Sequence, residues 1–582
     1  MLKMLRDVRE TVKLAPVDGE MEYTQWVNED LLPTPLPKQT WRAWNYITFY
    51  WSLSFTNWTL GSTMIGGGLS WWQSIMVIFI SQCISSIAMA FNSRVASVYH
   101  IGFPCVARSV FGMWGSYYFV GARAAIAVVW YALQRKWLPE SGIKGAVLTG
   151  VVYFGAQYMN NILRAIFGHQ FRDLPNRLPQ SAGITTSLML AFLLCWLIHL
   201  PFCHFRPYQL RKFFWFKAIV SLLAMFGLFI WAMADTNGHV GGLNSSSSRS
   251  ASSTTWLILA GINSGLGNTA TLITNQPDFA RWASNRRAPV WTQLIVNPIA
   301  VTVSASLGIL STNAVNVKYG TDIWNQWDML NLILDQYWCP KTRFAVFLCA
   351  FAWLVQIVGT NIAANLISFG SDAAMLFPRY LNMRRGQYLA QFLAWAVCPW
   401  KILASAATFQ TFLSGYGLFM AGVVAIMIAD CKSLRARSGF GGPSLTVADF
   451  CLTKGNVFIA SLYIGTPANQ NYYYHGGWNR QAMIAYIVGL ALPFPGFCGT
   501  LGARVSASAA QMMDLAWILS FTVSFVLYMF ICSVWPTRHM RMVKERGYTF
   551  EQVAPDRVSE RSATSLGEGL DRDEGIATGT ET

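Results

Sequence analysis

The chain of 582 residues is poor in charged side chains, which make up 12% of its composition. A soluble globular protein carries about 25% charged residues, so this chain cannot cover itself with a polar surface. Hydrophobic residues make up 53% instead, and they gather in runs of roughly 18 to 25, long enough to cross a bilayer as helices. The composition predicts an all-α integral membrane protein.

Motifs of enzymes, metal sites and channels are also missing from the sequence. The eleven cysteines form no CxxC pair and the seven histidines form no HxxxH or HExxH pattern, so we expect no catalytic residue, no metal and no cofactor. We interpret the cysteines as small packing residues. A repeated filter or a ring of charge, which a channel would need, is not visible either. These absences favour a transporter.

The formal net charge of +16 is spread over alternate loops between the apolar runs. This distribution is the positive-inside signature of a membrane protein and argues against a nucleic-acid partner. It places both termini in the cytoplasm, although the basic loop 136–182, assigned outside, disagrees. We expect a cytoplasmic N-terminal tail over 1–43 without a signal peptide, and a disordered cytoplasmic C-terminal tail over 537–582.

The apolar runs predict about twelve transmembrane helices within a transporter domain at 44–536. A further apolar stretch, Gly145–Phe167, is broken by polar residues and is interpreted as an interfacial or partly buried helix, with a thirteenth span left open. The predicted spans are 45–67, 71–92, 112–135, 183–203, 213–234, 255–275, 289–312, 345–371, 387–401, 403–429, 481–502 and 514–535.

The first and sixth spans carry glycine and small polar residues at mid-membrane, in Ser54–Gly68 and Gly261–Thr269. Irregular backbone is tolerated in a membrane only where it lines a cavity, and interrupted helices at matching positions mark the site of inverted-repeat transporters. We therefore expect repeats at about 44–235 and 254–430, followed by two extra helices at 480–536. The alternative is that these residues only allow close helix packing.

Five motifs in the same order resemble the nucleobase-cation-symport-1 family, in particular its fungal uracil, allantoin and uridine permease branch. The resemblance covers Trp26 to Trp535. It implies a leucine-transporter-type fold of five plus five helices. The motifs are WVNEDLLPTP (Trp26–Pro35), GLSWWQ (Gly68–Gln73), Arg123-Ala124 with WYALQ (Trp130–Gln134), NQPDFAR (Asn275–Arg281) and GTNIAAN (Gly359–Asn365).

Trp130 and Gln134 are four residues apart and share one face of the third helix. An indole can stack on a planar ring, and a carboxamide can pair with a –CO–NH– edge; packing with interhelical hydrogen bonds is the alternative reading. The resemblance implies that these two residues and Asn365 line the substrate site. Helices 1 and 6 would complete it through Ser54, Asn57, Asn268 and Thr269.

Gating residues are predicted at Leu413 and Tyr416, from hydrophobic position alone, and at Arg123. Arg123 is deep enough in an apolar span to need a partner: either it forms a cytoplasmic-side gate or ion pair, for example with Asp278, or it snorkels inward.

The coupling ion is expected to be a proton. Bacterial relatives hold sodium with helix 1 carbonyls and adjacent Ser and Thr hydroxyls on helix 8, and this chain offers only Gly359-Thr360 there, which weakens such a site. Because no carboxylate stands at the centre of a run, Asp278, Glu29 and Asp30 are the proton-carrier candidates, with a structural role as the alternative for each.

The predicted function is a proton-coupled symporter that imports an amide-bearing heterocycle such as uracil or allantoin across the plasma membrane. Transport of thiamine, nicotinamide riboside or a nucleoside, or an uncoupled uniporter or sensor, is the alternative. The predicted partners are this substrate, the lipid bilayer and, by resemblance, ubiquitination machinery acting on tail lysines such as Lys3, Lys13 and Lys544.

Overall fold

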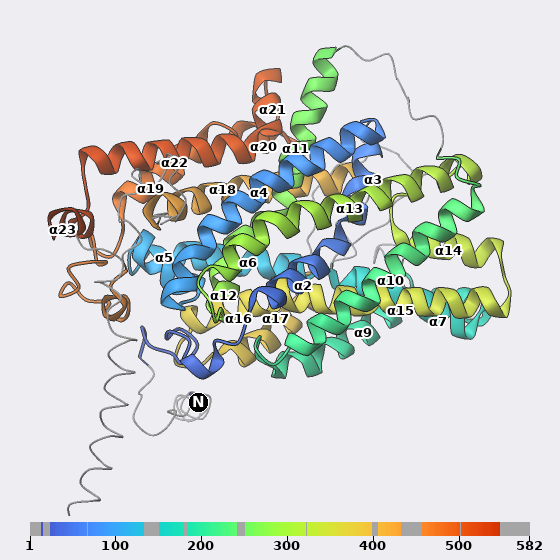
Figure 1. Cartoon of the computed structure of the whole chain (residues 1–582), viewed down its shortest axis with the longest axis horizontal. Helices are drawn as coiled ribbons and strands as arrows, with labels where there is room; N and C mark the ends of the chain where they lie inside the picture. The colour runs from blue at the N-terminus through green and yellow to red at the C-terminus, as the bar shows by residue number, and fades with distance from the viewer. Residues whose placement is uncertain are drawn as a thin grey trace, which may run out of the picture.

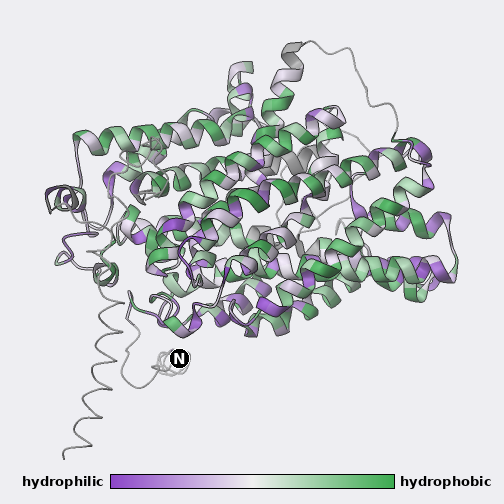
Figure 2. Cartoon of the chain, viewed as in Figure 1, coloured by the Kyte–Doolittle hydropathy of each residue, from purple (hydrophilic) through white to green (hydrophobic). Residues whose placement is uncertain are grey.

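A computed structural model describes residues 13–14, 24–66, 68–132, 151–179, 184–240, 251–321, 323–397, 406–431, 457–500 and 502–546. These ranges are helical and contain two isolated β-bridges but no strand. The long helices lie side by side with their axes close to the long axis of the molecule (Figure 1). Hydrophobic residues cover the helices, and hydrophilic ones gather at the connections on both ends (Figure 2). The all-α membrane fold is confirmed.

The first half of the chain contains α2 (Ala43–Ser54), α3 (Trp58–Gly66), α4 (Trp71–Tyr99), α5 (Phe103–Phe111), α6 (Gly115–Ala132), α7 (Val151–Phe167), α8 (His169–Arg172), α9 (Thr186–His199) and α10 (Arg211–Asp235). The second half contains α11 (Ala251–Thr274), α12 (Gln276–Ala280), α13 (Ala288–Tyr319), α14 (Gln326–Gln336), α15 (Pro340–Asn361), α16 (Ile367–Leu376), α17 (Met383–Val397) and α18 (Ala406–Cys431). The last part contains α19 (Arg480–Ala491), α20 (Phe494–Thr500), α21 (Ala507–Asp514), α22 (Ala516–Val534) and α23 (Arg538–Arg546).

Six helices of the described ranges are long and apolar enough to cross a membrane, and a seventh is obtained if α19 and α20, bent by 51°, form one span. The other five predicted spans are not among these: helix 1 (α2 and α3), helix 3 (α6), helix 6 (α11), helix 9 (α17) and helix 10 (α18). The total of twelve therefore stays a prediction.

The N-terminus of α4 shows how a sequence motif fixes a helix boundary. Ser70 Oγ accepts a hydrogen bond from the Gln73 backbone N–H at 3.4 Å, and Gln73 Oε1 accepts one from the Ser70 N–H at 3.0 Å. This is a capping box, which satisfies two backbone donors that the helix itself leaves free. The GLSWWQ motif thus starts helix 2 at a defined residue.

The stretch predicted as an interfacial or partly buried helix forms α7 inside the helix bundle. Helix 8 runs through α15 and α16, and α6 packs along α16 while α7 packs along α15. The two helices therefore follow one another along helix 8 and together cover the length of one span. Asn161 and Arg164, the polar interruptions, are buried against α14, so the partly buried alternative describes α7 and the interfacial one does not.

Helix contacts follow the exchange of helix n with helix n + 5 that an inverted repeat requires. Helix 1 (α2, α3) packs on helix 7 (α13), and helix 6 (α11) packs on helix 2 (α4). Helix 5 (α10) likewise packs on helix 1, and helix 10 (α18) packs on helix 6. The two central helices, α4 and α13, contact each other along their length. This arrangement supports the predicted repeats.

Both tails begin in ordered structure at the same end of the bundle. In the N-terminal tail, Leu31 and Trp41 are buried, and Arg108 of α5 donates hydrogen bonds to the carbonyls of Trp26 and Leu462. The C-terminal tail, predicted as disordered from residue 537, starts with helix α23, in which Met540 is buried. Residues 547–582, Lys3 and the side chain of Lys544 lie outside the described residues.

Candidate functional site

A cavity of about 110 Å³ lies where helices 1, 6, 7 and 8 and the first turn of α7 meet. Its described lining is neutral and rich in amides and hydroxyls. A ligand there would meet hydrogen-bond donors and acceptors without a fixed charge. The lining includes six predicted site residues and nine more: Leu53, Ser54, Thr56, Asn57, Thr59, Phe154, Asn268, Thr269, Thr271, Leu272, Asn297, Ile357, Thr360, Ala364 and Asn365.

Helix 1 is interrupted at the cavity, as predicted. α2 ends at Ser54 and a 3-10 turn over Phe55–Asn57 precedes α3. The Asn57 amide nitrogen donates to the Ser54 carbonyl at 3.0 Å, so the side chain is held against the 3-10 turn. Asn268 of helix 6 donates to Asn57 Oδ1 at 2.5 Å, which joins the two helices at the cavity.

The predicted break of helix 6 over Gly261–Thr269 is wrong, because α11 is continuous there. The glycines allow close packing instead: a Cβ on Gly261 would come within 2.9 Å of Val77, and one on Gly265 would overlap Ser81, both on α4. The chain breaks later, at Asn275, where α11 gives way to α12. The packing alternative therefore explains these glycines.

Asn365 lies in a π-helical turn, Ile362–Leu366, that the sequence did not reveal. Its amide nitrogen donates to Asn361 Oδ1 at 2.7 Å, and its side chain is 4% exposed. π-turns interrupt the regular ladder and are frequent at functional sites. The turn places Asn365 on the cavity opposite Asn57 and Asn268, so the structure brings together the residues predicted on helices 1, 6 and 8.

Three predicted residues cannot be placed in this way. Gln134 lies outside the described residues, and the side chains of Trp130 and Leu413 do too, although their backbones belong to α6 and α18. Tyr416 is 7% exposed, and its hydroxyl donates to the Gly267 carbonyl. It therefore joins helix 10 to helix 6 directly beside Asn268, which suits the predicted gating role.

Lys217 of helix 5 occupies the region predicted for a coupling ion. Its ammonium donates to Thr360 Oγ1 at 2.9 Å, and the side chain is fully buried. Gln356 donates to the Ser52 carbonyl of helix 1 at 2.5 Å and to the same Thr360 oxygen at 3.3 Å. The lysine thus stands where helix 1 carbonyls and a helix 8 hydroxyl meet, and no described carboxylate forms an ion pair with it.

A buried charged cluster, formed by Arg123, Asp278 and Asp372, lies at the end of these helices that contacts the N-terminal tail. Arg123 Nε donates to Asp372 Oδ2 at 2.9 Å, and Arg123 Nη1 pairs with Asp278 Oδ2 at 2.7 Å. Asn275 Oδ1 accepts from Arg123 at 3.3 Å and Asp278 Oδ1 accepts from Ser371 at 3.0 Å. The predicted pairing of Arg123 with Asp278 is confirmed, and snorkelling is excluded because Arg123 is 1% exposed.

Asp30 and Glu29 hold the N-terminal tail and do not line the cavity. The Asp30 carboxylate accepts from the Met383 backbone N–H at 2.7 Å, and its carbonyl accepts from Arg281 at 2.8 Å. Glu29 forms an ion pair of 2.7 Å with Arg206. Both carboxylates therefore act in attaching the tail, which favours their structural alternative.

Two residues of these polar regions, Asp372 and Lys217, were not predicted from the sequence. Asp372 follows the predicted end of helix 8 at residue 371, whereas the helix continues to Leu376. Lys217 stands near the start of the predicted fifth span and would have been found by asking which partner a lysine inside an apolar run has.

Comparison with solved structures identifies the fold. The chain matches Mhp1, a nucleobase-cation-symport-1 family transporter solved in a closed conformation with bromovinylhydantoin bound, with a TM-score of 0.64 and 17% identity over 89% of this chain and 99% of that one. An inward-facing conformation of Mhp1 gives a TM-score of 0.62. The chain therefore has the helical membrane fold of the leucine-transporter type.

Sequence comparison gives the particular family. The protein-family model described as "Permease for cytosine/purines, uracil, thiamine, allantoin" matches residues 33–520 of this chain. The allantoin permease of Saccharomyces cerevisiae is 32% identical over 88% of this chain and 76% of its own length, and the uridine permease of the same yeast is 30% identical over the same shares. The chain belongs to the nucleobase-cation-symport-1 family, among relatives of the fungal allantoin, uridine and uracil permeases.

Proposed function

We propose that the chain is a plasma-membrane symporter that imports a neutral heterocycle with a –CO–NH– edge, such as uracil or allantoin, together with a proton. The observation that carries this proposal is the neutral, amide-lined cavity between helices 1, 6 and 8. Amide side chains provide donor and acceptor together, which matches the edge of such a ring. Transport, not catalysis, is also what the printed names of the relatives describe.

A competition assay tests the substrate class. Cells that express the chain are given labelled uracil with an excess of uracil, allantoin, uridine, thiamine or nicotinamide riboside. Neutral rings with an amide edge should compete, whereas cationic thiamine and nicotinamide riboside should not, because no charged side chain lines the described cavity. Competition by thiamine alone would contradict the proposal.

Lys217 supports coupling to protons. An ammonium beside Thr360 repels a sodium ion from the position that helix 1 carbonyls and a helix 8 hydroxyl would otherwise offer. A lysine buried in a membrane protein can bind a proton in one conformation and release it in another. In this proposal, the protonated side chain holds Thr360 and Gln356 near helix 1, and deprotonation frees helix 5 from helix 8.

The variant Lys217→Met tests this assignment, because it keeps the length of the side chain and removes the charge. In proteoliposomes with an internal pH dye, substrate should acidify the lumen for the wild-type chain and for the exposed control Lys212→Met, but not for Lys217→Met. Removal of sodium at constant pH should leave wild-type uptake unchanged. Loss of uptake without sodium, or normal acidification by Lys217→Met, would overturn proton coupling through Lys217.

A further inference from the structure

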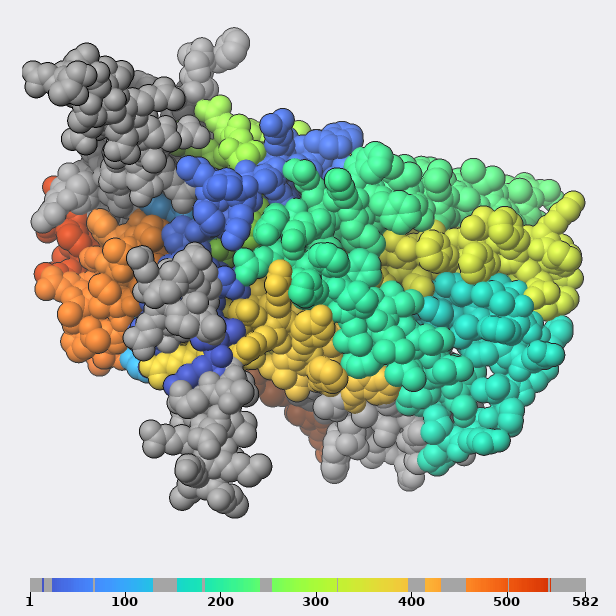
Figure 3. Space-filling view, turned by 90° about the horizontal axis from the view of Figure 1, so that it is seen from below, coloured from blue at the N-terminus to red at the C-terminus, as the bar shows by residue number. Residues whose placement is uncertain are grey.

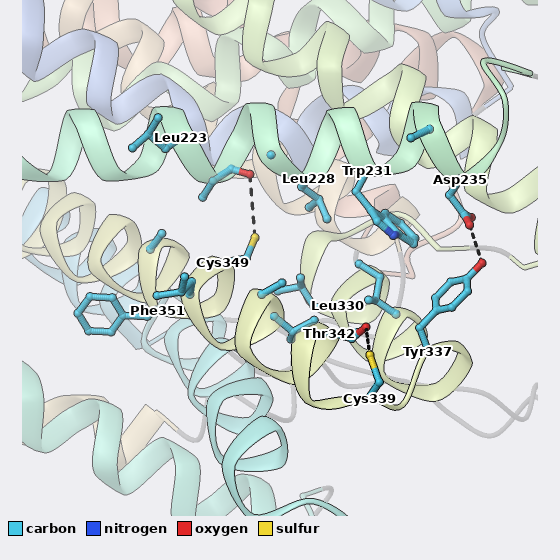
Figure 4. Close-up of a pocket in the computed structure, with 18 of the residues that line it drawn as sticks. Leu223, Leu228, Trp231, Asp235, Leu330, Tyr337, Cys339, Thr342, Cys349 and Phe351 are labelled. Carbon is cyan, nitrogen blue, oxygen red and sulfur yellow. Dashed lines mark hydrogen bonds between the residues drawn. The ribbon is translucent and has the colours of Figure 1, made fainter.

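A second, larger hollow lies on the side of the bundle, between helix 5 and the start of helix 8. It encloses about 1130 Å³ and is lined by α10, α14 and α15. Figure 4 shows Leu223, Leu228 and Trp231 of α10 facing Leu330, Cys349 and Phe351 across this groove. Figure 3 shows α10 in green beside the yellow α14–α15 segment on the face seen from below.

The groove opens toward the surface that the bilayer covers. Leu223 is 69% exposed, and Leu348 and Phe351 on the opposite wall are 49% and 43% exposed. Large apolar side chains at this exposure, on helices long enough to span a membrane, contact lipid. An occupant can therefore enter sideways from the bilayer and does not need an aqueous path.

The floor of the groove is flat because small residues line it. Ala224 and Gly227 on α10 face Ala345, Cys349 and Ala352 on α15. A Cβ added to Gly227 would meet no other atom within 4 Å, so open space lies directly above the helix backbone. A rigid, flat apolar ring system fits such a floor without ordering flexible chains, which limits the entropy lost on binding.

One end of the groove is polar and carries no net charge. Tyr337 donates to Asp235 Oδ1 at 2.6 Å, and Lys318 neutralises the same carboxylate at 2.8 Å. Tyr337 is 42% exposed, and its hydroxyl lies 3.2 Å from that of Tyr319. Because Tyr319 donates its proton to Asp235 Oδ2 at 2.9 Å, the Tyr337 oxygen can accept a hydrogen bond from a ligand. This end lies beside α14, opposite the end that holds α5 and both tails (Figure 1).

We propose that this groove binds a membrane sterol, with the rings on the small-residue floor and the single hydroxyl hydrogen-bonded to Tyr337. A phospholipid fits less well, because its phosphate requires a cation and no lysine or arginine is among the described residues that line the groove. Lys318 pairs with Asp235, and Arg343 donates to the carbonyls of Ala165 and Ile166. Lys341, which follows Cys339 by two residues, is exposed and is not part of the lining. If both tails are cytoplasmic, as the proposed function assumes, the polar end of the groove lies at the outer leaflet, and this part of the inference rests on the proposed function.

Photolabelling of the full chain in liposomes tests the site, with a diazirine sterol as probe. The label is expected in peptides of α10 and α15. Gly227→Phe fills the groove and should lower labelling about tenfold, as the loss of one well-filled apolar subsite predicts. Ile230→Phe is the matched control, because Ile230 lies on the same helix, is 62% exposed and is not part of the lining. It should label like the wild-type chain.

Two further measurements test the sterol site: the preference for a hydroxyl-bearing probe and the protection of Cys339 from labelling. Wild-type chain should prefer the sterol probe over a matched probe without the hydroxyl, and Tyr337→Phe should lose this preference. Cys339, exposed at the polar end, reports occupancy: hydrogen bonds from Thr342 hold the pKa of its thiol below the usual value, so it should react readily with maleimide, and sterol should protect it.

Wild-type labelling of Gly227→Phe, label outside α10 and α15, or displacement of the sterol by a phospholipid probe would each overturn the sterol site. These results do not depend on uptake, so a chain that takes up no heterocycle yet binds sterol would contradict the proposed function alone.

Discussion

Helices 6 and 8 carry two polar regions of opposite character. Asn268 and Asn365 line the cavity. Seven residues further along each helix, Asn275 and Asp372 belong to the buried charged cluster around Arg123. Seven residues are two helical turns, so each pair lies on one face of its helix. The upper region is neutral in its described residues, whereas the lower one contains an arginine between two aspartates.

The two regions differ in how completely their polar groups are paired. In the cluster, the charged side chains of Arg123, Asp278 and Asp372 pair with one another. Behind the cavity lining, Asn361 accepts a hydrogen bond from Asn365, and its own amide nitrogen has no partner among the described residues. A neutral region with an unpaired hydrogen-bond donor suits a ligand. A charged region in which every charge is paired suits a latch that opens as a unit, and we call Arg123, Asp278 and Asp372 the latch.

Breaking the latch should have the largest effect. Arg123→Ala leaves two carboxylates buried without their cation, which costs about 3–5 kcal/mol. We expect lower surface expression and a lower melting temperature of the purified chain. Arg172→Ala is the control, because its ion pair with Asp335 spans 2.9 Å at the surface with Arg172 half exposed, and such pairs contribute about 1 kcal/mol or less.

The charge balance can be restored without the latch. Arg123→Met combined with Asp278→Asn and Asp372→Asn should recover stability but not uptake, because the neutral side chains no longer hold this end of the helices together. Wild-type stability of Arg123→Ala alone would show that the cluster is not the closed latch.

Changing the cavity should abolish function without harming the fold. Asn365→Ala removes one amide from the lining, and a lost hydrogen bond to a buried polar partner costs about 1–3 kcal/mol. We expect uptake to disappear while surface expression persists, and the same for Gln134→Ala. Asn331→Ala is the control, since Asn331 lies on α14, accepts a hydrogen bond from Arg164 of α7 and does not line the cavity. Gln134 is assigned by the sequence prediction alone, so normal uptake by both Asn365→Ala and Gln134→Ala would remove the proposed site.

The sequence predicted the described cavity from two kinds of signal. Asn57 and Asn268 stand on or beside the small-polar segments of helices 1 and 6, Asn365 belongs to the helix 8 motif, and all three line the cavity as expected. Backbone irregularities were harder to predict. The π-turn at Asn365 and the continuity of α11 through its glycines depend on what α4 and its neighbours place against them, and no local pattern contains that information.

The helix 6 glycines give the smallest test, and it separates packing from irregular backbone. Gly265→Ala should destabilise the chain, because the new methyl overlaps Ser81 on α4; overpacking of this kind costs about 1–3 kcal/mol. Ser81→Gly in the same chain should restore most of the melting temperature. Gly227→Ala, which meets no atom within 4 Å, should be neutral or stabilising by up to about 1 kcal/mol. If Ser81→Gly fails to rescue, the glycine is required for backbone freedom, and the sequence-based interpretation of a broken helix 6 regains support for another conformation of the transporter.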